Sequence, residues 1–564
     1  MSLHKYFENL SFVDYFHLVV LFFLFYVIKF YYKYFTRPNK LPGPLPLPII
    51  ECAYCFRGDT KHLFVSLNKK YGDFYEIQLG GYRRIVLSRP EHIEKFYNNS
   101  TKHVKFMPRA PFSRGLKELL MGGKGLQFSD DFNSWKFNRQ IYTRAILSPN
   151  FNNEAIKWSY LLFEELEGYW KSLGLANSDG EEWTLETDFS KWFQRFTNDM
   201  VVVSTTGERS YSMGTYYNTL SPIKALYPDA LIEDSDRFVK GMNQIVVGAA
   251  LFLFLGPFIR HYVPFIRGKA NEILKHRDFI FEKLDKIIQK RRQEIEVMKN
   301  KDLKNDMLTS LIIANTERDV NYKKTVGEET MPDIEIRTNI FGAFAAGTDT
   351  TANLFCYITY YLCHYPEVKQ KMLAEIDSIF PQNSSIQLTH NDLSKLKYCE
   401  AIIKEVDRII PVSNILARYS SEPFEVGGYQ WPAGTLFNFD IVSLHRHKDY
   451  WPCPEIFDPN RFFLDNKNES YLNVKNDDLK DDNNGHNEKK DQKVGQKYSF
   501  IMFGSGSRIC PGRKLAIIEL LSLMVYVFGK YDVELIDMEA PLKTKSSIAT
   551  TCLELMVRIR PRNQ

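Results

Sequence analysis

The chain has 564 residues, 44% of them hydrophobic, and a net charge of +5 from 73 basic and 68 acidic side chains. This composition is typical of a globular protein and excludes a disordered one, and the near balance of charge gives no indication of nucleic-acid binding. Eight cysteines scattered over so long a chain exclude the disulfide framework of small secreted domains.

An apolar, aromatic-rich segment, residues 12–35, comes first. Its centre from Leu18 to Ile28 carries no charge, and the whole segment reaches the ~20 residues that a membrane-spanning helix needs. Basic residues follow it, so the positive-inside rule places the rest of the chain in the cytosol. A cleaved signal peptide is the alternative, but bulky aromatic residues stand where its small-residue cleavage site would lie. We therefore expect residues 1–36 to be an uncleaved anchor.

A proline-rich hinge over residues 37–48 joins this anchor to one large domain, residues 37–564. Four prolines in the stretch Leu41 to Pro48 exclude a helix interior and stiffen the connection. Cys52 and Cys55 follow as a C-x-x-C pair, but no second pair stands at zinc spacing. We interpret them as small apolar residues in a loop, with metal binding or redox chemistry as the alternative.

The rest of the chain predicts a mainly α fold with small β-sheets, an α+β class. Helix-like apolar spacing dominates, and short β-like runs such as residues 74–88 occur near the start. The apolar run Val246–Phe258 is too short to span a bilayer and predicts either a buried core helix or a contact with the membrane surface. Residues 466–493 are dense in Asn, Asp and Lys, which predicts a mobile, low-complexity surface insertion.

The stretch FGSGSRICPG, Phe503 to Gly512, carries the clearest chemical signal. Its glycines allow a tight turn and the close approach of a large planar ligand. Pro511 suits the first turn of a helix, which would place Cys510 at a helix N-terminus, where a thiolate is favoured. Such a thiolate can ligate haem iron. A lone cysteine would more simply be an inert buried thiol, but the whole decapeptide makes that alternative unattractive.

The pattern Phe503-x-x-Gly506-x-Arg508-x-Cys510-x-Gly512 resembles the haem-binding loop of the cytochrome P450 family. The resemblance implies the family's fold and a haem cofactor. It further implies that Cys510 ligates the iron, that Arg508 contacts a haem propionate, and that Phe503 and Gly504 belong to the same cofactor-binding loop.

A second motif, AFAAGTDTTANLF at residues 343–355, lies in an apolar run bounded by Pro332 and Pro366. Gly347 and Thr350 share a helix face, where the glycine would open a groove beside the hydroxyl. With Asp349 next in sequence, an acid and an alcohol stand together, a combination that can relay protons. A polar patch on a helix is the simpler interpretation of any one of these residues. The block resembles the family's oxygen-activating helix, which implies catalytic roles for Thr350 and Asp349.

Three further motifs occur in the family's order. Trp135 and Arg139 share a helix face and resemble the pair that the family directs at the haem propionates, and Arg418 resembles a further propionate contact. The alternative for Trp135 and Arg139 is that they form an exposed pair on an amphipathic helix. Glu405, Arg408 and Arg461 resemble a structural network of the family, so we expect them to support the fold, not catalysis.

The resemblance implies a haem-thiolate monooxygenase that inserts one oxygen atom of O2 into a lipophilic small molecule. Electrons would come from NADPH through a separate NADPH-cytochrome reductase, with Arg513 and Lys514 as candidate docking residues. The anchor would hold the enzyme by a single pass in the endoplasmic reticulum membrane. The rival hypotheses are an O2-independent isomerase or dehydratase, which often lacks the acid and alcohol, and a non-catalytic haem sensor.

Overall fold

The computed structural model describes residues 11–56, 59–97, 108–109, 114–119, 124–129, 131–175, 183–227, 234–299, 303–304, 306–318, 330–380, 387–463, 498–547 and 549–562. The insertion expected at residues 466–493 lies outside these described residues.

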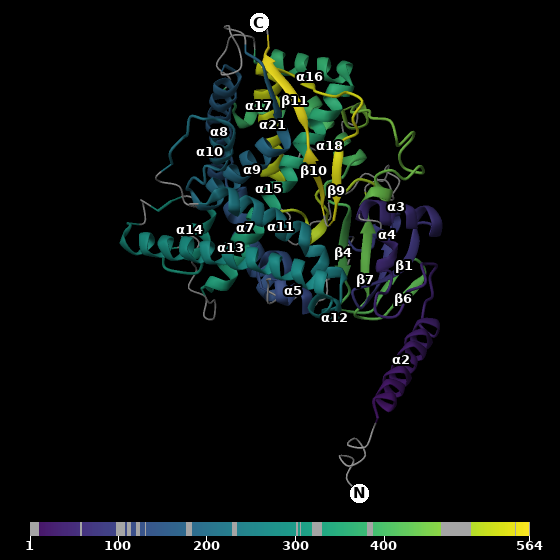
Figure 1. Cartoon of the computed structure of the whole chain (residues 1–564). Helices are drawn as coiled ribbons and strands as arrows, with labels where there is room; N and C mark the ends of the chain where they lie inside the picture. Colours follow the sequence, from purple (N-terminus) through teal and green to yellow (C-terminus); the bar gives the residue numbers. More distant parts are fainter. Residues whose placement is uncertain are drawn as a thin grey trace, which may run out of the picture.

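The apolar N-terminal segment forms one helix, α2 (Phe12–Phe35). It begins with a capping box, in which Ser11 and Asp14 satisfy each other's backbone N–H groups. By length and composition this helix could cross a membrane, and none of its side chains is buried in the protein. Figure 1 shows it projecting away from the body. An isolated apolar helix of this kind needs a non-aqueous environment around it.

The hinge after α2 is fastened to the first sheet. Arg37 forms an ion pair with Glu76, a buried carboxylate that also pairs with Arg83. Asn39 Nδ2 donates a hydrogen bond of 2.6 Å to the backbone oxygen of Gln430. These contacts, together with the prolines, fix where the chain enters the body.

Within the described ranges, the strands form one sheet of four strands and three smaller ones. The four-stranded sheet has the order β1-β2-β7-β4, antiparallel except for the parallel pair β2 and β7. A three-stranded sheet has the order β3-β11-β8, and two hairpins pair β5 with β6 and β9 with β10. The strands are β1 (Phe74–Leu79), β2 (Tyr82–Leu87), β3 (Leu185–Asp188), β4 (Ile415–Tyr419), β5 (Phe424–Val426), β6 (Tyr429–Trp431), β7 (Leu436–Asp440), β8 (Tyr531–Leu535), β9 (Lys543–Ser546), β10 (Thr550–Glu554) and β11 (Met556–Pro561).

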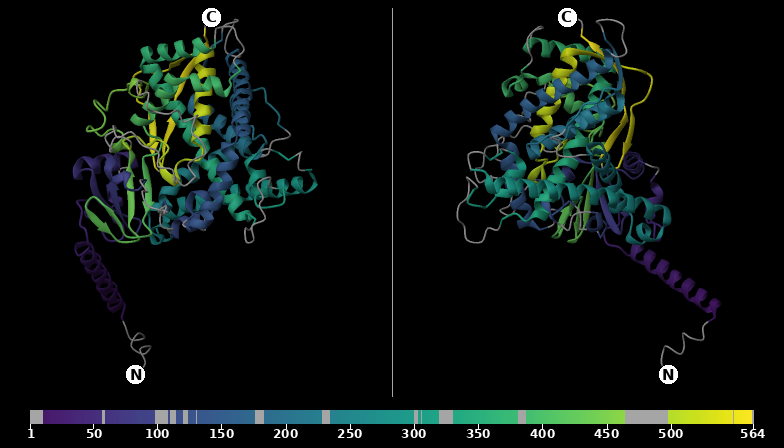
Figure 2. Two further views of the ribbon diagram at one scale, coloured as in Figure 1. Left: turned by 180° about the vertical axis from the view of Figure 1, so that it is seen from behind. Right: turned by 60° about the vertical axis from the view of Figure 1, so that its left-hand side comes forward.

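Helices make up most of the body, as expected of a mainly α protein. Figure 2 shows them massed on one side of the four-stranded sheet, with the N-terminal helix α2 outside the body. Those before the long central helix are α3 (Thr60–Tyr71), α4 (Pro90–Glu94), α5 (Arg114–Leu119), α6 (Gly125–Phe128), α7 (Phe132–Leu147), α8 (Pro149–Leu175), α9 (Phe189–Thr206), α10 (Ser212–Leu220), α11 (Ser235–Phe254), α12 (Pro257–Tyr262), α13 (Pro264–Val297) and α14 (Met307–Ile313). The others are α15 (Asp333–His364), α16 (Pro366–Ile379), α17 (His390–Lys395), α18 (Lys397–Ile409), α19 (Ile441–Leu444), α20 (Asn460–Phe463) and α21 (Arg513–Lys530), with single turns at Ala53–Cys55 and Gly506–Arg508.

The apolar run Val246–Phe258 is divided between two helices. The first, α11, ends at Phe254, and α12 begins at Pro257, which suits the first position of a helix. Phe252 is buried, whereas Phe258 is 63% exposed. Phe252 therefore belongs to the core and Phe258 to the surface, so the core interpretation holds for part of the run and the contact with a membrane surface stays a prediction.

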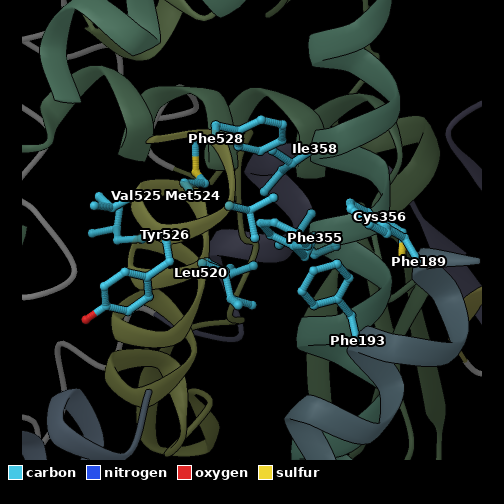
Figure 3. Close-up of a cluster of buried hydrophobic side chains, with 14 of the residues drawn as sticks. Phe189, Phe193, Phe355, Cys356, Ile358, Leu520, Met524, Val525, Tyr526 and Phe528 are labelled. Atoms are coloured by element: carbon cyan, nitrogen blue, oxygen red, sulfur yellow. The ribbon is translucent and has the colours of Figure 1, made fainter. Parts of the chain in front are cut away.

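The largest apolar core fixes α15 against α9 and α21. Figure 3 shows Phe193 of α9 and Phe355 of α15 facing one another beside Leu520 of α21. The rings of Phe193 and Phe355 lie with their centroids 4.4 Å apart, and all three side chains are fully buried. Each such side chain contributes about 1.5–3 kcal/mol. This packing holds the helix of the acid–alcohol motif in a fixed position relative to the helix that follows Cys510.

Candidate functional site

The glycine-rich loop before α21 places Cys510. Gly504 and Gly506 have φ of +71° and +65°, a left-handed conformation that favours glycine. The N–H of Cys510 closes the loop by donating to the carbonyl of Phe503 at 2.9 Å. The expectation that Pro511 lies in the first turn of the helix is wrong, because α21 begins only at Arg513. A short turn therefore separates the thiol from the helix.

The surroundings of the Cys510 thiol act on it in opposite directions. Burial raises its pKa, whereas the N–H of Gly512 and the guanidinium groups of Arg109 and Arg139 oppose that shift. Arg513 acts in the same sense, and its Nη1 donates to the Cys510 carbonyl at 3.2 Å. A coordinating metal removes the proton of a thiol outright, so this thiol surrounded by cations is suited to metal ligation.

The prediction that Arg513 is a docking residue for the reductase is wrong. Arg513 is buried, with 2% of its surface exposed, so it cannot serve as a contact for a docking reductase. Lys514 is half-buried, and burial lowers its pKa.

Four arginines gather near Cys510. Burial and then the charges of Arg109, Arg418 and Arg139 lower the pKa of Arg508 to about 8. Burial and then the charge of Arg418 lower the pKa of Arg109 to about 10. Buried like charges at close quarters are costly unless an anion lies among them. The cluster therefore fits a ligand that carries more than one negative charge.

Trp135 and Arg508 hold this cluster in place. Arg508 donates to the carbonyls of Leu126 and Ser129 at 3.1 and 3.0 Å, and its guanidinium lies 4.7 Å from the centroid of the Trp135 ring. Trp135 and Arg139 are both buried on α7, so they are not an exposed surface pair. Arg418 of β4 donates to the hydroxyl of Tyr97 at 3.2 Å. The loop, α7 and β4 thus meet at one place.

Arg109 was missed by the sequence analysis. Its signal is an arginine set between prolines and large apolar residues in the stretch FMPRAPF, Phe106 to Phe112. A charge in such surroundings points to burial beside a partner, but the sequence alone does not say which partner.

The acid and the alcohol of α15 point in different directions. Thr350 Oγ1 donates to the carbonyl of Ala346 at 2.6 Å, one turn earlier on the same helix. The carboxylate of Asp349 is 5% exposed and accepts from Gln194 Nε2 of α9 at 2.8 Å. Burial raises the pKa of Asp349, and its amide neighbours oppose that shift. The two residues therefore do not bond to each other, although they are adjacent in sequence.

Gly347 has another role than expected. A Cβ at this position would lie 2.5 Å from Cγ2 of Val201, so a side chain here would clash with α9. The glycine permits the close packing of α9 on α15, and Val201 fills the groove that the sequence analysis assigned to an open pocket.

Glu405, Arg408 and Arg461 come together away from the cysteine loop. Arg408 donates to both oxygens of Glu405, at 2.7 and 2.9 Å, and neither side chain is exposed. Its remaining N–H groups donate to the carbonyls of His445, Pro454 and Ile456. Arg461 approaches the same carboxylate at 3.5 Å. The guanidinium of Arg408 thus has an acceptor for each of its N–H groups, as a buried arginine must have.

The arginine cluster beside Cys510 is thus a candidate site for a ligand that carries more than one negative charge. A family model, Cytochrome P450, matches residues 41–558. The chain therefore belongs to the cytochrome P450 family. It is accordingly a P450 monooxygenase, an oxidoreductase with haem as its cofactor, and the resemblance seen in the sequence is confirmed.

Individual relatives are distant but match over most of their length. Cytochrome P450 3A17 of Cavia porcellus is 24% identical over 502 residues, 88% of this chain and 86% of the relative. Steroid 17-alpha-hydroxylase/17,20 lyase of Ictalurus punctatus is 25% identical over 504 residues, which are 89% of this chain and 86% of the relative. (S)-1-hydroxy-N-methylcanadine 13-hydroxylase of Papaver somniferum is 24% identical over 570 residues, with 95% of this chain and 93% of the relative covered.

The fold is that of a solved haem domain. The crystal structure of the cytochrome P450DA heme domain superposes with a TM-score of 0.70 at 18% identity, covering 93% of this chain and 98% of that one. This confirms the predicted fold, a mainly α P450 fold with small sheets.

Proposed function

We propose that Cys510 is the axial ligand of the haem iron and that Arg109, Arg139, Arg418 and Arg508 receive the haem propionates. The observation that carries this assignment is the gathering of these four arginines beside one cysteine. Two carboxylates would offset the burial and the repulsion that together lower the pKa of Arg508 to about 8. Trp135 would then hold Arg508 against the cofactor, as its position 4.7 Å from that guanidinium suggests.

The haem, when bound, supplies the activation of O2 and the transfer of one oxygen atom to the substrate. In this proposal the chain contributes the proton for the other oxygen atom. The hydroxyl hydrogen of Thr350 is directed at Ala346, so its oxygen lone pairs are left to accept a hydrogen bond. Asp349 is the acid, because its burial raises its pKa and favours a bound proton.

We further propose a lipophilic small molecule as the substrate. One relative is named a steroid 17-alpha-hydroxylase/17,20 lyase, and another an (S)-1-hydroxy-N-methylcanadine 13-hydroxylase. The exposed apolar corner formed by Phe258, Tyr262 and Phe265, which are 63, 73 and 71% exposed, offers a surface at which such a molecule could leave a membrane.

The same corner supports a membrane location. In Figure 1, α12 lies at the end of the body from which α2 leaves. Leu45 and Leu47 of the hinge, and Ile49 directly after it, are also exposed. We propose that α2 crosses the endoplasmic reticulum membrane once, that residues 1–36 are the anchor, and that residues 37–564 form a cytosolic catalytic domain resting on the membrane at this end.

Electrons are proposed to come from NADPH through a cytochrome P450 reductase. Of the two docking residues considered, only Lys514 retains accessible surface. A contact there would lie close to Cys510 in the chain, on the side of the haem that the thiolate would occupy.

The test is turnover of the full-length chain in lipid with reductase, NADPH and a panel of sterols, fatty acids and alkaloids. Binding of a substrate is read from the shift of the haem absorption as water leaves the iron, and reaction from oxygenated product. Product that requires both O2 and NADPH is expected. Conversion of a bound lipophile without O2 would overturn the proposal in favour of an isomerase or dehydratase. The absence of any conversion across ligands that give the spectral shift would favour a haem sensor.

A further inference from the structure

Asp349 is held by two amides from two different helices. Gln194 Nε2 of α9 donates to Oδ1 at 2.8 Å, and Asn243 Nδ2 of α11 approaches Oδ2 at 3.5 Å. Among the described residues, burial and these two amides account for the shift in the pKa of the carboxyl. An ionised carboxylate only accepts hydrogen bonds, so both amides must present their NH2 groups to it.

The same two amides line a polar cleft of about 880 Å³ that reaches the surface. Its outer part includes the exposed side chains of Lys191 and Gln244, and its inner part includes Asn353, one turn after Asp349 on α15. Asn353 Oδ1 accepts from the N–H of Cys552 at 2.9 Å. The amides and hydroxyls of this lining can hold water, and Gln194 and Asn243 connect the cleft to the carboxyl of Asp349 through their hydrogen bonds.

Charged groups also line this cleft, from four of the elements around it. They come from β3, α9, α11 and β10, and they are Glu186, Asp188, Lys191, Arg195, Asp236, Lys240 and Glu554. The innermost cation, Arg195, is bonded to Asp236 at 2.6 Å, and Lys240 pairs with the same carboxylate. Two more of these carboxylates pair with cations outside the cleft lining, Glu186 with Arg558 and Glu554 with Lys543. The neutral amides are the groups that hydrogen-bond to Asp349.

We propose that Gln194 and Asn243, which line this cleft, are positioning residues that hold the Asp349 carboxyl beside it and set how readily the carboxyl gives up its proton. The inference rests on the proposed role of Asp349 as the acid. Hydrogen bonds donated to a carboxyl favour its ionised form, so removing a donor must make the carboxyl keep its proton to higher pH. Gln194 has the stronger effect, since its contact is shorter.

The experiment measures the protonation of Asp349 directly, in the full-length holoenzyme. The carboxylic C=O stretching band is identified by its loss in Asp349→Asn and is followed by infrared difference spectroscopy as the pH is varied. Gln194→Leu should move the titration midpoint upward by about one pH unit, the size expected from losing one hydrogen bond to a charged group. Asn243→Leu should move it less. Gln244→Leu, in the same cleft without a bond to Asp349, is the matched control and should leave it unchanged.

Gln194→Glu is the second variant, because it preserves the size of the side chain if leucine disturbs the packing. An ionised glutamate cannot donate and repels the ionised form of Asp349, so it should raise the midpoint further than leucine does. The coupling, measured as product formed per NADPH consumed, should shift its pH dependence in the same order as the infrared midpoints. A midpoint unchanged in both Gln194 variants would overturn the inference.

Failure of the proposed function gives a different pattern. If Asp349→Asn forms as much product per NADPH consumed as the wild type, the proposed catalytic role of Asp349 is wrong. The infrared midpoints would still shift in that case, because they depend only on the hydrogen bonds. If Asp349→Asn consumes NADPH without forming product, but the midpoints of the Gln194 variants do not shift, only the positioning role of Gln194 and Asn243 is wrong.

Discussion

Arg508 lies over the ring of Trp135, its guanidinium carbon 4.7 Å from the ring centroid. One residue comes from the cysteine loop and the other from α7, so the contact fastens together two motifs that are far apart in the sequence. A partly buried cation–π contact of this kind contributes roughly 0.5–2 kcal/mol. It also orients the guanidinium, whose remaining bonds go to the carbonyls of Leu126 and Ser129.

Trp135→Leu should weaken haem retention by roughly two- to thirtyfold, because Arg508 loses the ring that orients it. The measurement is the ratio of haem to protein after challenge with apomyoglobin as a haem acceptor. Lys136→Ala, an exposed neighbour on the same helix, is the control. Equal haem loss in the two variants would show that Trp135 has no part in holding the cofactor.

Cys510→Ala should abolish the red-shifted Soret band of the ferrous–CO complex that a thiolate ligand produces. The physical reason is that the thiolate pushes electron density onto the iron, which no other ligand does equally. Absorption spectra of the reduced protein under CO provide the measurement. Cys453→Ala removes an exposed thiol and should keep the band. If Cys510→Ala retained it, another residue would be the ligand.

Thr350→Val should keep haem and substrate binding but waste electrons. The substitution preserves volume and removes the hydroxyl that is proposed to pass protons. NADPH consumption should continue while product falls and hydrogen peroxide rises, and Thr350→Ser should restore much of the coupling. All three quantities are measured on one preparation. Product and NADPH use falling in parallel, with coupling unchanged, would indicate a packing role only.

Arg408→Lys should lower the free energy of unfolding by about 3–5 kcal/mol, the cost of breaking a buried ion pair. A lysine cannot provide the bonds that Arg408 makes to Glu405 and to three backbone carbonyls. Chemical denaturation in detergent gives the measurement. Arg558→Lys alters an exposed pair with Glu186 and should change stability by no more than about 1 kcal/mol. Similar effects from both substitutions would mean that the network carries little stability.

Removing residues 1–36 should release the protein from membranes only in part. The exposed side chains of Phe258, Tyr262 and Phe265 would still bind the surface. Flotation with liposomes measures the bound fraction, and a truncated variant with serine at these three positions should no longer float. Full release by the truncation alone would exclude a second membrane contact at α12 and α13.

Sequence alone determined the features that depend on neighbouring residues. Pro332 and Pro366 delimit α15 because proline lacks an N–H and clashes with the preceding turn. Gly504 and Gly506 shape the cysteine loop because glycine adopts positive φ without strain. Glu405 and Arg408 meet because residues three apart share a helix face. The specific spacing around Cys510 was sufficient to suggest the family and its cofactor.

Tertiary structure decided which distant groups face each residue. Arg109 joins the arginine cluster, Val201 fills the space beside Gly347, and burial removes Arg513 from the surface. Nothing local distinguishes Gln194 or Asn243 from any other amide on a helix, yet the packing of α9 and α11 against α15 directs both at Asp349. Such contacts arise from the way whole helices pack, and the free energy that fixes them is spread over a core shared by many side chains. A single sequence records those side chains but not which of them meet.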